Sequence, residues 1–159
     1  MTEPPIRSVS ATILVLALLL SGCGLSGVLR EAKDVANPSV VGELSIRVRK
    51  GEPVVWRPDA CLSGEHEQFF GFILASNGSP VVLRAVVDPL DGPGLRVVGL
   101  EGTGGLVVRP DQCERLDLVV EPTGWRVNDI QDLSGTLDVS CRTTDGTSVE
   151  GALEVRHCH

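Results

Sequence analysis

Short segments in which apolar and polar residues alternate follow one another along most of this chain. From Glu43 onward, apolar side chains recur at every second position, as in Leu44–Val48, Leu116–Val120 and Leu137–Cys141. A period of two puts successive side chains on opposite faces of a strand, so each segment is expected to bury one face. Turn residues separate the segments, and long helical periodicity is absent from the sequence. The pattern predicts an all-β domain over residues 43–159, an antiparallel β-sandwich of seven to eight strands.

The final hairpin of this domain can be placed in register from its turn. A two-residue turn would set Leu137 opposite Glu154 and mix the apolar face with the polar one. A three-residue loop over residues 144–146 sets Leu137 opposite Leu153 and keeps each face uniform, so this register is expected. Gly146 then takes the left-handed position that such loops require.

The first 23 residues have the layout of a bacterial export signal. A short polar lead containing Arg7 precedes an apolar run over residues 11–20. About ten apolar residues are too few to span a membrane, which takes roughly 20, but they fit the central region of a signal peptide. The following Leu20-Ser21-Gly22-Cys23 resembles the lipobox of bacterial lipoproteins.

This resemblance implies an anchored, exported protein. Residues 1–22 would be removed, and Cys23 would carry a thioether-linked diacylglycerol and further acylation, which anchors a chain stably in a membrane. Gly24 stands where an Asp favours inner-membrane retention in lipoprotein sorting, so the resemblance implies the outer membrane. Residues 23–42, interrupted by Pro38, are expected to form a lipidated tether before the sandwich.

The remaining cysteines are predicted to form two disulfides. Beyond residue 23 the chain contains Cys61, Cys113, Cys141 and Cys158. An even number in an exported domain indicates paired thiols. Cys141 and Cys158 would lie about nine residues apart along the hairpin, roughly 30 Å, whereas a disulfide needs Cα atoms within about 7 Å. In an up-and-down succession of strands, Cys113 starts one long strand and Cys141 ends the next, so both lie at one end of the sandwich, and the favoured pairs are Cys113–Cys141 and Cys61–Cys158. Cys61–Cys113 stays an alternative, because Cys113 falls on the polar phase of its strand and needs a bulge there.

A second, shorter resemblance concerns the form of the sandwich. Four segments follow one another in this part of the chain: a short strand from Leu95, a Pro turn at Arg109-Pro110-Asp111, a strand ending in Glu121-Pro122-Thr123-Gly124, and a strand opening with Gly135. This succession, which ends at Val139, is similar to immunoglobulin-like domains of the type found in hydin. It implies an immunoglobulin-like sandwich and no activity.

Composition excludes several classes of partner. The net charge is −7 and the cations form no basic stripe, which argues against nucleic acid and against electrostatic docking on anionic lipid. The chain has no tyrosine, two tryptophans and three phenylalanines, so aromatic platforms for sugars or bases are scarce.

Three polar clusters could carry chemistry, and each has a simpler explanation. His157-Cys158-His159 resembles a metal-binding tail, but strand neighbours point to opposite faces and a disulfide would remove the thiolate, so an exposed chain end is favoured. Glu65-His66-Glu67 could exchange protons, but no nucleophile motif accompanies it. Asp88 and Asp91 lack the alternating ligands of a calcium loop. No catalytic residue, metal ligand or cofactor is assigned.

The leading hypothesis is a non-catalytic binding or structural module at the cell envelope. The loops 57–68, 88–94 and 123–132 are the expected contact surfaces for another envelope protein. Trp125 is the best candidate anchor if it is exposed in its loop; alternatively it folds back to cap the core. A periplasmic ligand or metal carrier is the alternative function, and an envelope enzyme is less favoured.

Overall fold

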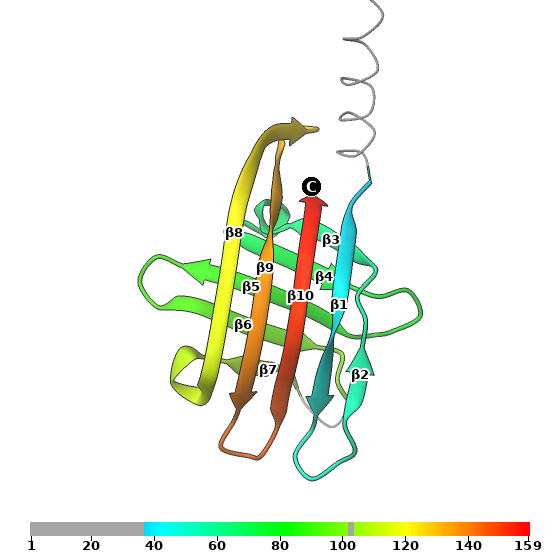
Figure 1. The fold of residues 1–159 in the computed structure, drawn as a ribbon, viewed down its shortest axis with the longest axis vertical. Coiled ribbons are helices and arrows are strands. Elements are labelled where there is room, and N and C mark those ends of the chain that lie inside the picture. The colour runs from blue at the N-terminus through cyan, green and yellow to red at the C-terminus, as the bar shows by residue number, and fades with distance from the viewer. Residues whose placement is uncertain (1–36, 102–103) are drawn as a thin grey trace, which may run out of the picture. The chain divides into compact units, whose positions relative to one another are not determined.

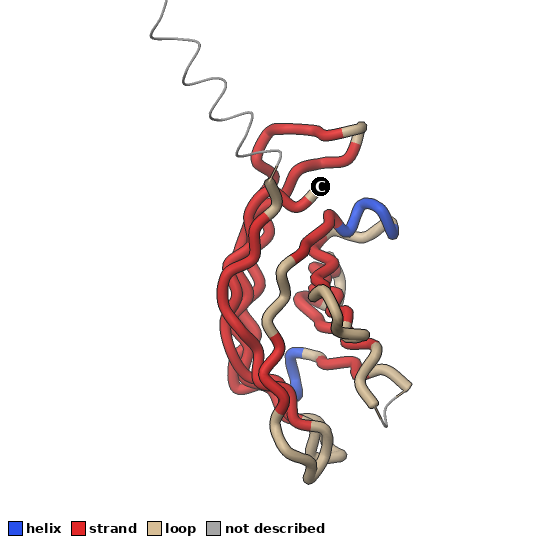
Figure 2. The backbone as a smooth tube through the Cα atoms, turned by 90° about the vertical axis from the view of Figure 1, so that its right-hand side faces the viewer, coloured by secondary structure: helices blue, strands red, loops and turns tan. Residues whose placement is uncertain are grey.

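Two five-stranded antiparallel sheets, packed face to face, make up the part of the chain that the computed structural model describes, residues 37–101 and 104–159 (Figures 1 and 2). The first sheet has the order β2 (Val54–Trp56), β1 (Ser39–Arg47), β10 (Ser148–Cys158), β9 (Ile130–Arg142) and β8 (Cys113–Val127). The second sheet has the order β3 (Ala60–Ser63), β4 (Gly71–Ala75), β5 (Val82–Asp88), β6 (Gly92–Val98) and β7 (Leu106–Val108). Two short 3₁₀ helices are η1 (Gly64–Glu67) and η2 (Pro110–Gln112).

The strands of the second sheet run across those of the first (Figure 1). Nearly every strand pairs with its neighbour in sequence, and the β1–β10 pair joins the two ends of the described chain. An immunoglobulin sandwich instead distributes its strands by Greek-key connections. The predicted all-β sandwich is therefore confirmed, while the strand order is a meander and the described strands number ten rather than seven or eight.

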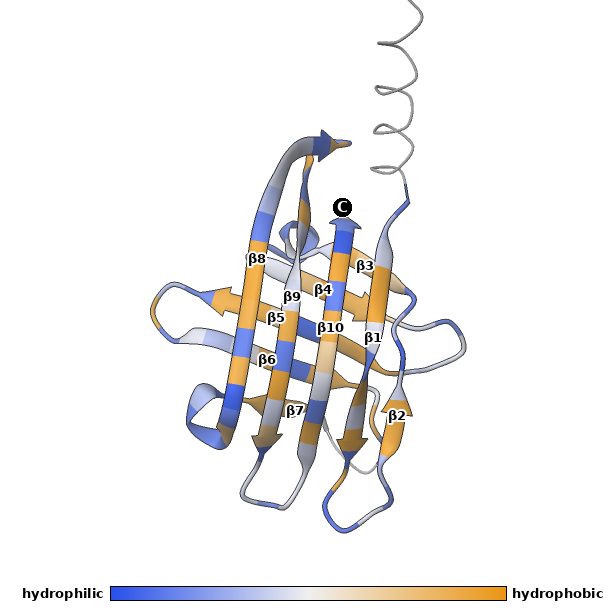
Figure 3. Ribbon diagram, in the orientation of Figure 1, coloured by the Kyte–Doolittle hydropathy of each residue, from blue (hydrophilic) through white to orange (hydrophobic). Residues whose placement is uncertain are grey.

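The core consists of the alternate side chains of each strand that point between the two sheets. Cross-strand register aligns Cys61, Leu74, Leu83, Val97 and Leu106 in one row across the second sheet, all of them buried. The first sheet contributes alternate residues of β9 and β10, and Figure 3 shows the resulting alternation of apolar and polar bands along these strands. One sheet face from each layer is thus removed from water, which is the main driving force for the fold.

The register of the final hairpin is confirmed. Leu137 pairs with Leu153 and Cys141 with Val149, as the uniform faces require. Gly146 has φ +84° at the end of the three-residue loop, a conformation that glycine adopts without steric cost.

Both favoured disulfides are present in the structure. Cys61 bonds to Cys158 and thereby joins β3 of the second sheet to β10 of the first. Cys113 bonds to Cys141, its direct partner across β8 and β9, and the register shifts immediately after Cys113, which is the bulge that this pairing needed. Two disulfides indicate an oxidising, extracytoplasmic location.

The predicted boundary between tether and sandwich needs correction, and the predicted signal peptide lies outside the described residues. β1 begins at Ser39, so the last four residues of the expected tether belong to the sandwich. Pairing with β10 from Ser39 to Arg47 explains the difference, because the partner strand is long enough to order the chain before the alternation begins. The signal peptide over residues 1–22, the lipid-bearing Cys23 and Gly24 lie outside the described residues.

Candidate functional site

The hairpin of β8 and β9 extends beyond the other strands of the first sheet (Figure 1). Its distal part, Pro122–Leu133, is called the hairpin tip here. Asn128 and Asp129 form its two-residue turn, with φ of +50° and +66°, the left-handed pair that a tight hairpin turn prefers. The predicted loop over residues 123–132 is therefore wrong: the segment is mostly paired strand.

A bulge shapes this tip. Three residues of β8, Thr123 to Trp125, lie opposite the single residue Asp132 of β9, because the register shifts between Pro122 and Arg126. Gly124 adopts φ +88° within the bulge. Pro122 and Gly124 are turn-forming residues, which is why the sequence reads as a loop, yet a bulge absorbs both without ending the strand.

Trp125 lies in this bulge rather than in a loop. Its side chain is 46% exposed to solvent and does not belong to the core. Its backbone is fixed on both sides: the amide donates to Thr123 Oγ1 at 3.4 Å, and the carbonyl accepts from Gln131 Nε2 at 2.9 Å. The half-exposed indole is therefore carried by a backbone that hydrogen bonds hold in place.

The helix η1 holds the hairpin tip from the side of the second sheet. The Glu65 carboxylate accepts from the backbone amide of Gln131 at 2.5 Å and from Arg126 Nη2 at 3.0 Å. The hydrogen bond from the Gln131 amide, followed by that from Arg126, lowers the pKa of Glu65 below its ordinary value. Two of the three expected contact segments, residues 57–68 and 123–132, therefore meet at one end of the sandwich.

A groove of about 400 Å³ lies where these elements meet. Its lining includes Glu65, Phe70, Arg126, Gln131 and Leu133. Phe70, immediately before β4, is 44% exposed. An apolar ring, a guanidinium and an amide thus face one shallow depression, which is a combination typical of protein-binding surfaces.

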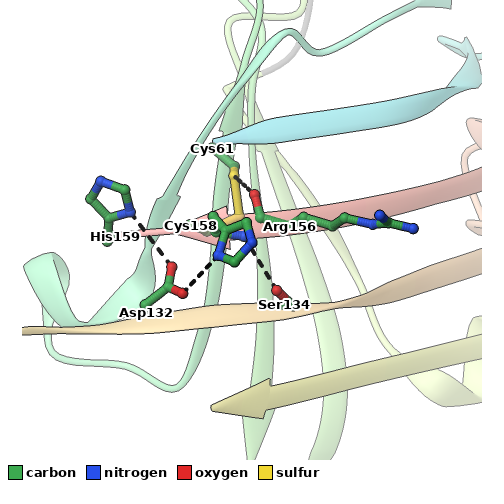
Figure 4. The surroundings of a disulfide bond; sticks show 7 residues. Cys61, Asp132, Ser134, Arg156, Cys158 and His159 are labelled. Carbon is green, nitrogen blue, oxygen red and sulfur yellow. Dashed lines mark hydrogen bonds and ion pairs between the residues drawn. A yellow bond between two sulfur atoms is a disulfide. The ribbon is translucent and has the colours of Figure 1, made fainter. Parts of the chain in front are cut away.

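The hairpin tip contains a buried carboxylate, that of Asp132 (Figure 4). Asp132 has no exposed surface, and its Oδ2 accepts from Thr123 Oγ1 at 2.6 Å. His157 Nδ1 lies 3.0 Å from Oδ2, and His159 Nδ1 lies 3.5 Å from Oδ1. A second bulge in β10 brings His157 to this place: its φ is +56°, and its amide donates to Ser134 Oγ. A buried carboxylate is costly without such partners.

The C-terminal tail is therefore not the exposed chain end that the sequence favoured. Cys158 is fully buried in its disulfide, and the side chains of His157 and His159 are only 25% and 18% exposed. Figure 4 shows His159 beside the Asp132 carboxylate. Among the described residues, no group of three or more His, Cys, Asp or Glu is arranged to hold a metal ion.

The other acidic clusters have structural partners. Glu67 binds Arg84 through two hydrogen bonds of 2.6 and 2.8 Å, which lower the pKa of Glu67, while His66 is exposed. Asp88 accepts from the backbone amides of Leu90 and Asp91, which lower its pKa and close the turn before β6. Residues 88–94 do not join the hairpin end; most of them line a second groove, beside β6 and β7.

Sequence reasoning missed Asp132 as the centre of this end of the molecule. Strand alternation gives no sign of it, because bulges in β8 and β10 bring Thr123 and His157 to the carboxylate, and His159 follows the end of β10. Trp125 can be identified from the sequence because tryptophan is costly to expose, whereas nothing in the sequence distinguishes Phe70 from a core residue.

Comparison with protein-family models, with curated proteins and with solved structures gives no match for this chain. Over the described residues, no helix has both the length and the apolar character needed to cross a membrane.

Proposed function

We propose that this chain is a lipoprotein of the cell envelope that acts as a non-catalytic binding module. In this proposal Cys23 carries the lipid, Gly24 directs the protein to the outer membrane, and the sandwich presents its hairpin end to another envelope protein. The two disulfides support an extracytoplasmic address. The lipobox-like Leu20-Ser21-Gly22-Cys23 supports the anchor.

One observation carries the binding role: two half-exposed aromatic side chains on a rigidly held end of the fold. Trp125 is 46% exposed and Phe70 is 44% exposed. Phe70 lines the groove, and Trp125 directly precedes Arg126, which lines it as well. Glu65 fixes Arg126 and the Gln131 amide. Pre-ordered aromatic and arginine side chains lower the entropy cost of association and dominate the binding energy of many interfaces.

The proposal is tested by purifying the full chain from solubilised envelopes. A reproducible protein partner should be recovered with the native chain and lost with Trp125→Ala. The matched control is Leu90→Ala, because Leu90 is 94% exposed in the β5–β6 turn, away from the hairpin end. Loss of the partner with both variants, or with neither, would contradict a role for the hairpin end.

The anchor is tested separately by the intact mass of the native protein. A chain beginning at Cys23 with two or more acyl chains supports the lipoprotein assignment, and Cys23→Ser should release the protein from the membrane fraction. An unprocessed N-terminus without fatty acid would refute the proposed lipid anchor. The proposed binding role of the hairpin end would then still be tested by the purification experiment.

A further inference from the structure

One edge of the first sheet is long and unpaired. β8 is the last strand of that sheet, and no other described strand pairs with its outer edge. Between the two bulges of β8, residues 115–122 pair with β9 without interruption. The strands at the other sheet ends, β2, β3 and β7, have only three or four residues. A short edge strand limits pairing with other chains, whereas a long regular edge offers them a row of N–H and C=O groups.

The core is open along this β8 edge. Leu116 and Leu118 pack against the core. Their cross-strand partners in β9, Val139 and Leu137, are 0% and 3% exposed. Leu116, Leu118 and the next inward residue, Val120, are themselves only partly buried. The inner side chains of β8 therefore keep some contact with water, because no strand lies beyond them.

The second sheet projects beyond the β8 edge. Figure 1 shows the turn between β5 and β6 beyond β8, and β8 lies close to both of these strands. Ala85 and Leu95, a cross-strand pair on the inner face of the second sheet, are 0% and 2% exposed. Two residues nearer the turn, on the same face, Val87 and Pro93 pair but are only partly buried. The apolar inner face thus continues past the last strand of the first sheet.

We infer that the β8 edge receives one extended segment of the partner protein as an added strand, an inference that rests on the proposed binding function. The backbone of the segment hydrogen-bonds to the outward N–H and C=O groups of residues 115–122. Its inward side chains cover Leu118 and Val120 and pack on Val87 and Pro93. In this mode of recognition, main-chain hydrogen bonds give affinity and alternate side chains give specificity. The added strand completes the core at its open edge and leads toward the hairpin tip, into which β8 continues.

The outer face of β8 indicates the chemistry of this segment. Asp117 lies directly opposite Asp138 of β9, and like charges in such a pair repel each other. Arg115 binds Asp138 at 2.8 Å, whereas Asp117 and Glu121 have no salt bridge to any residue of the described chain. Cations at the outward positions of the added strand neutralise both carboxylates. The expected segment therefore alternates apolar residues, which face the core, with lysine or arginine.

A second copy of this chain fits the β8 edge less well than a single strand. In an antiparallel pair of β8 strands, both β5–β6 turns project to the same side of the joined sheet, and each enters the space beside the β8 of the other copy. A twofold axis that separates the turns makes the two strands parallel and places their apolar faces on opposite sides. A single added strand meets neither obstacle.

The test uses the full chain in a nonionic detergent with two probe peptides of about nine residues, the length of the β8 edge. In one peptide valine alternates with lysine, and in the other valine alternates with glutamate. The valine–lysine peptide should slow hydrogen exchange of alternate amides within residues 115–121 by about tenfold or more, because the intervening amides already donate to β9. Amides of β2 and β7 should not change. The valine–glutamate peptide should bind about tenfold more weakly.

A charge exchange separates loss of fold from loss of the interaction. Asp117→Lys should weaken binding of the valine–lysine peptide severalfold and strengthen binding of the valine–glutamate peptide, which a misfolded chain could not do. The matched control is Glu150→Lys, which makes the same change of charge on the exposed face of β10, in the middle of the first sheet. It should leave both affinities unchanged.

Four results would overturn the inference. Alternate β8 amides that are already protected in the free chain at every concentration would show that the chain's own residues cover the edge, and protection that rises with chain concentration would show that a second copy does. No added protection by either peptide at millimolar concentration, or equal effects of Asp117→Lys and Glu150→Lys, would exclude strand addition. If the envelope partner is lost with Trp125→Ala while no peptide binds at β8, the proposed function stands and strand addition alone is refuted.

Discussion

Asp132 shows how much a single buried charge constrains the residues around it. Its carboxylate has no exposed surface: Oδ2 has Thr123 and His157 as hydrogen-bond partners, whereas Oδ1 has no hydrogen bond and lies 3.5 Å from His159 Nδ1. Each of those partners is set in place by a bulge or by the end of the chain. The bulges in β8 and β10 thus supply polar partners to one side chain. They are tolerated because burying a carboxylate without partners costs far more free energy than forming a bulge.

Replacing Thr123 by valine tests this dependence. Thr123→Val keeps the shape of the side chain but removes the hydroxyl that donates to Asp132 at 2.6 Å. The loss of one donor to a buried carboxylate should lower the free energy of unfolding by about 1–3 kcal/mol. Urea denaturation with both disulfides intact measures the change.

Thr136→Val is the matched control for that variant. Thr136 is exposed on the outer face of β9, the same strand that carries Asp132. Its replacement should change the free energy of unfolding by less than about 0.5 kcal/mol. Equal effects of the two variants would show that the Thr123 hydroxyl has no special importance to Asp132.

At the level of elements, the features that could be predicted from the sequence are those that depend on local alternation of apolar and polar residues. The β9–β10 register follows from keeping Leu137 and Leu153 on one face, and the disulfides follow from that register. The hairpin tip was misassigned because Pro122 and Gly124 usually end strands, and pairing across a bulge is not visible locally. Of the candidate site, Trp125 and the segments 57–68 and 123–132 were predicted, but their meeting at one end of the sandwich was not.

The number and order of strands could be predicted less well. β2 and β7 have three residues each, too few to show a period of two. Alternation tells which face of a strand is buried but not which strand lies beside it. Pairing of β1 with β10, at opposite ends of the described chain, depends on packing of the whole sandwich and has no local signal.

Removing the Glu65 carboxylate should loosen the hairpin tip without unfolding the sandwich. In Glu65→Ala the amide of Gln131 loses its acceptor at 2.5 Å, so its hydrogen exchange should become severalfold faster. The matched control is Glu67→Ala in the same turn of η1, because that carboxylate binds Arg84 and not the hairpin. Amide exchange followed by NMR measures both, and faster exchange in the Glu67 variant alone would contradict the assignment.

Acid should have the same effect as the Glu65 variant. The pKa of Glu65 is lowered in the fold from its ordinary value of 4.5. The contribution of its carboxylate is therefore complete above that value and is lost as the pH falls through the lowered pKa. Protection of the Gln131 amide, corrected for intrinsic exchange, should decline over this window in the native chain and stay flat in Glu65→Ala. A decline in both would place the cause elsewhere.

At the level of the whole molecule, the two disulfides have different consequences. Cys113–Cys141 joins neighbouring strands of one sheet and closes 28 residues, whereas Cys61–Cys158 joins the two sheets and closes 97. By the chain-entropy model, these cross-links stabilise the fold by about 3.6 and about 4.7 kcal/mol. Strand pairing between β8 and β9 would also keep Cys113 near Cys141 without the bond, while β3 and β10 belong to different sheets.

The variant without Cys61–Cys158 should therefore be the less stable one. Cys61→Ala with Cys158→Ala and Cys113→Ala with Cys141→Ala each remove two sulfur atoms, but Cys113 is only partly buried, so loss of packing and the longer closed loop both make the first variant the less stable. Urea denaturation should give the first variant a free energy of unfolding lower by about 1 kcal/mol or more. The first variant should also release the C-terminal strand, so that His157 and His159 leave Asp132 and the hairpin tip loses protection before the sandwich unfolds. Equal stabilities with an unchanged tip would show that packing alone holds the sheets together and that the bond between them is dispensable.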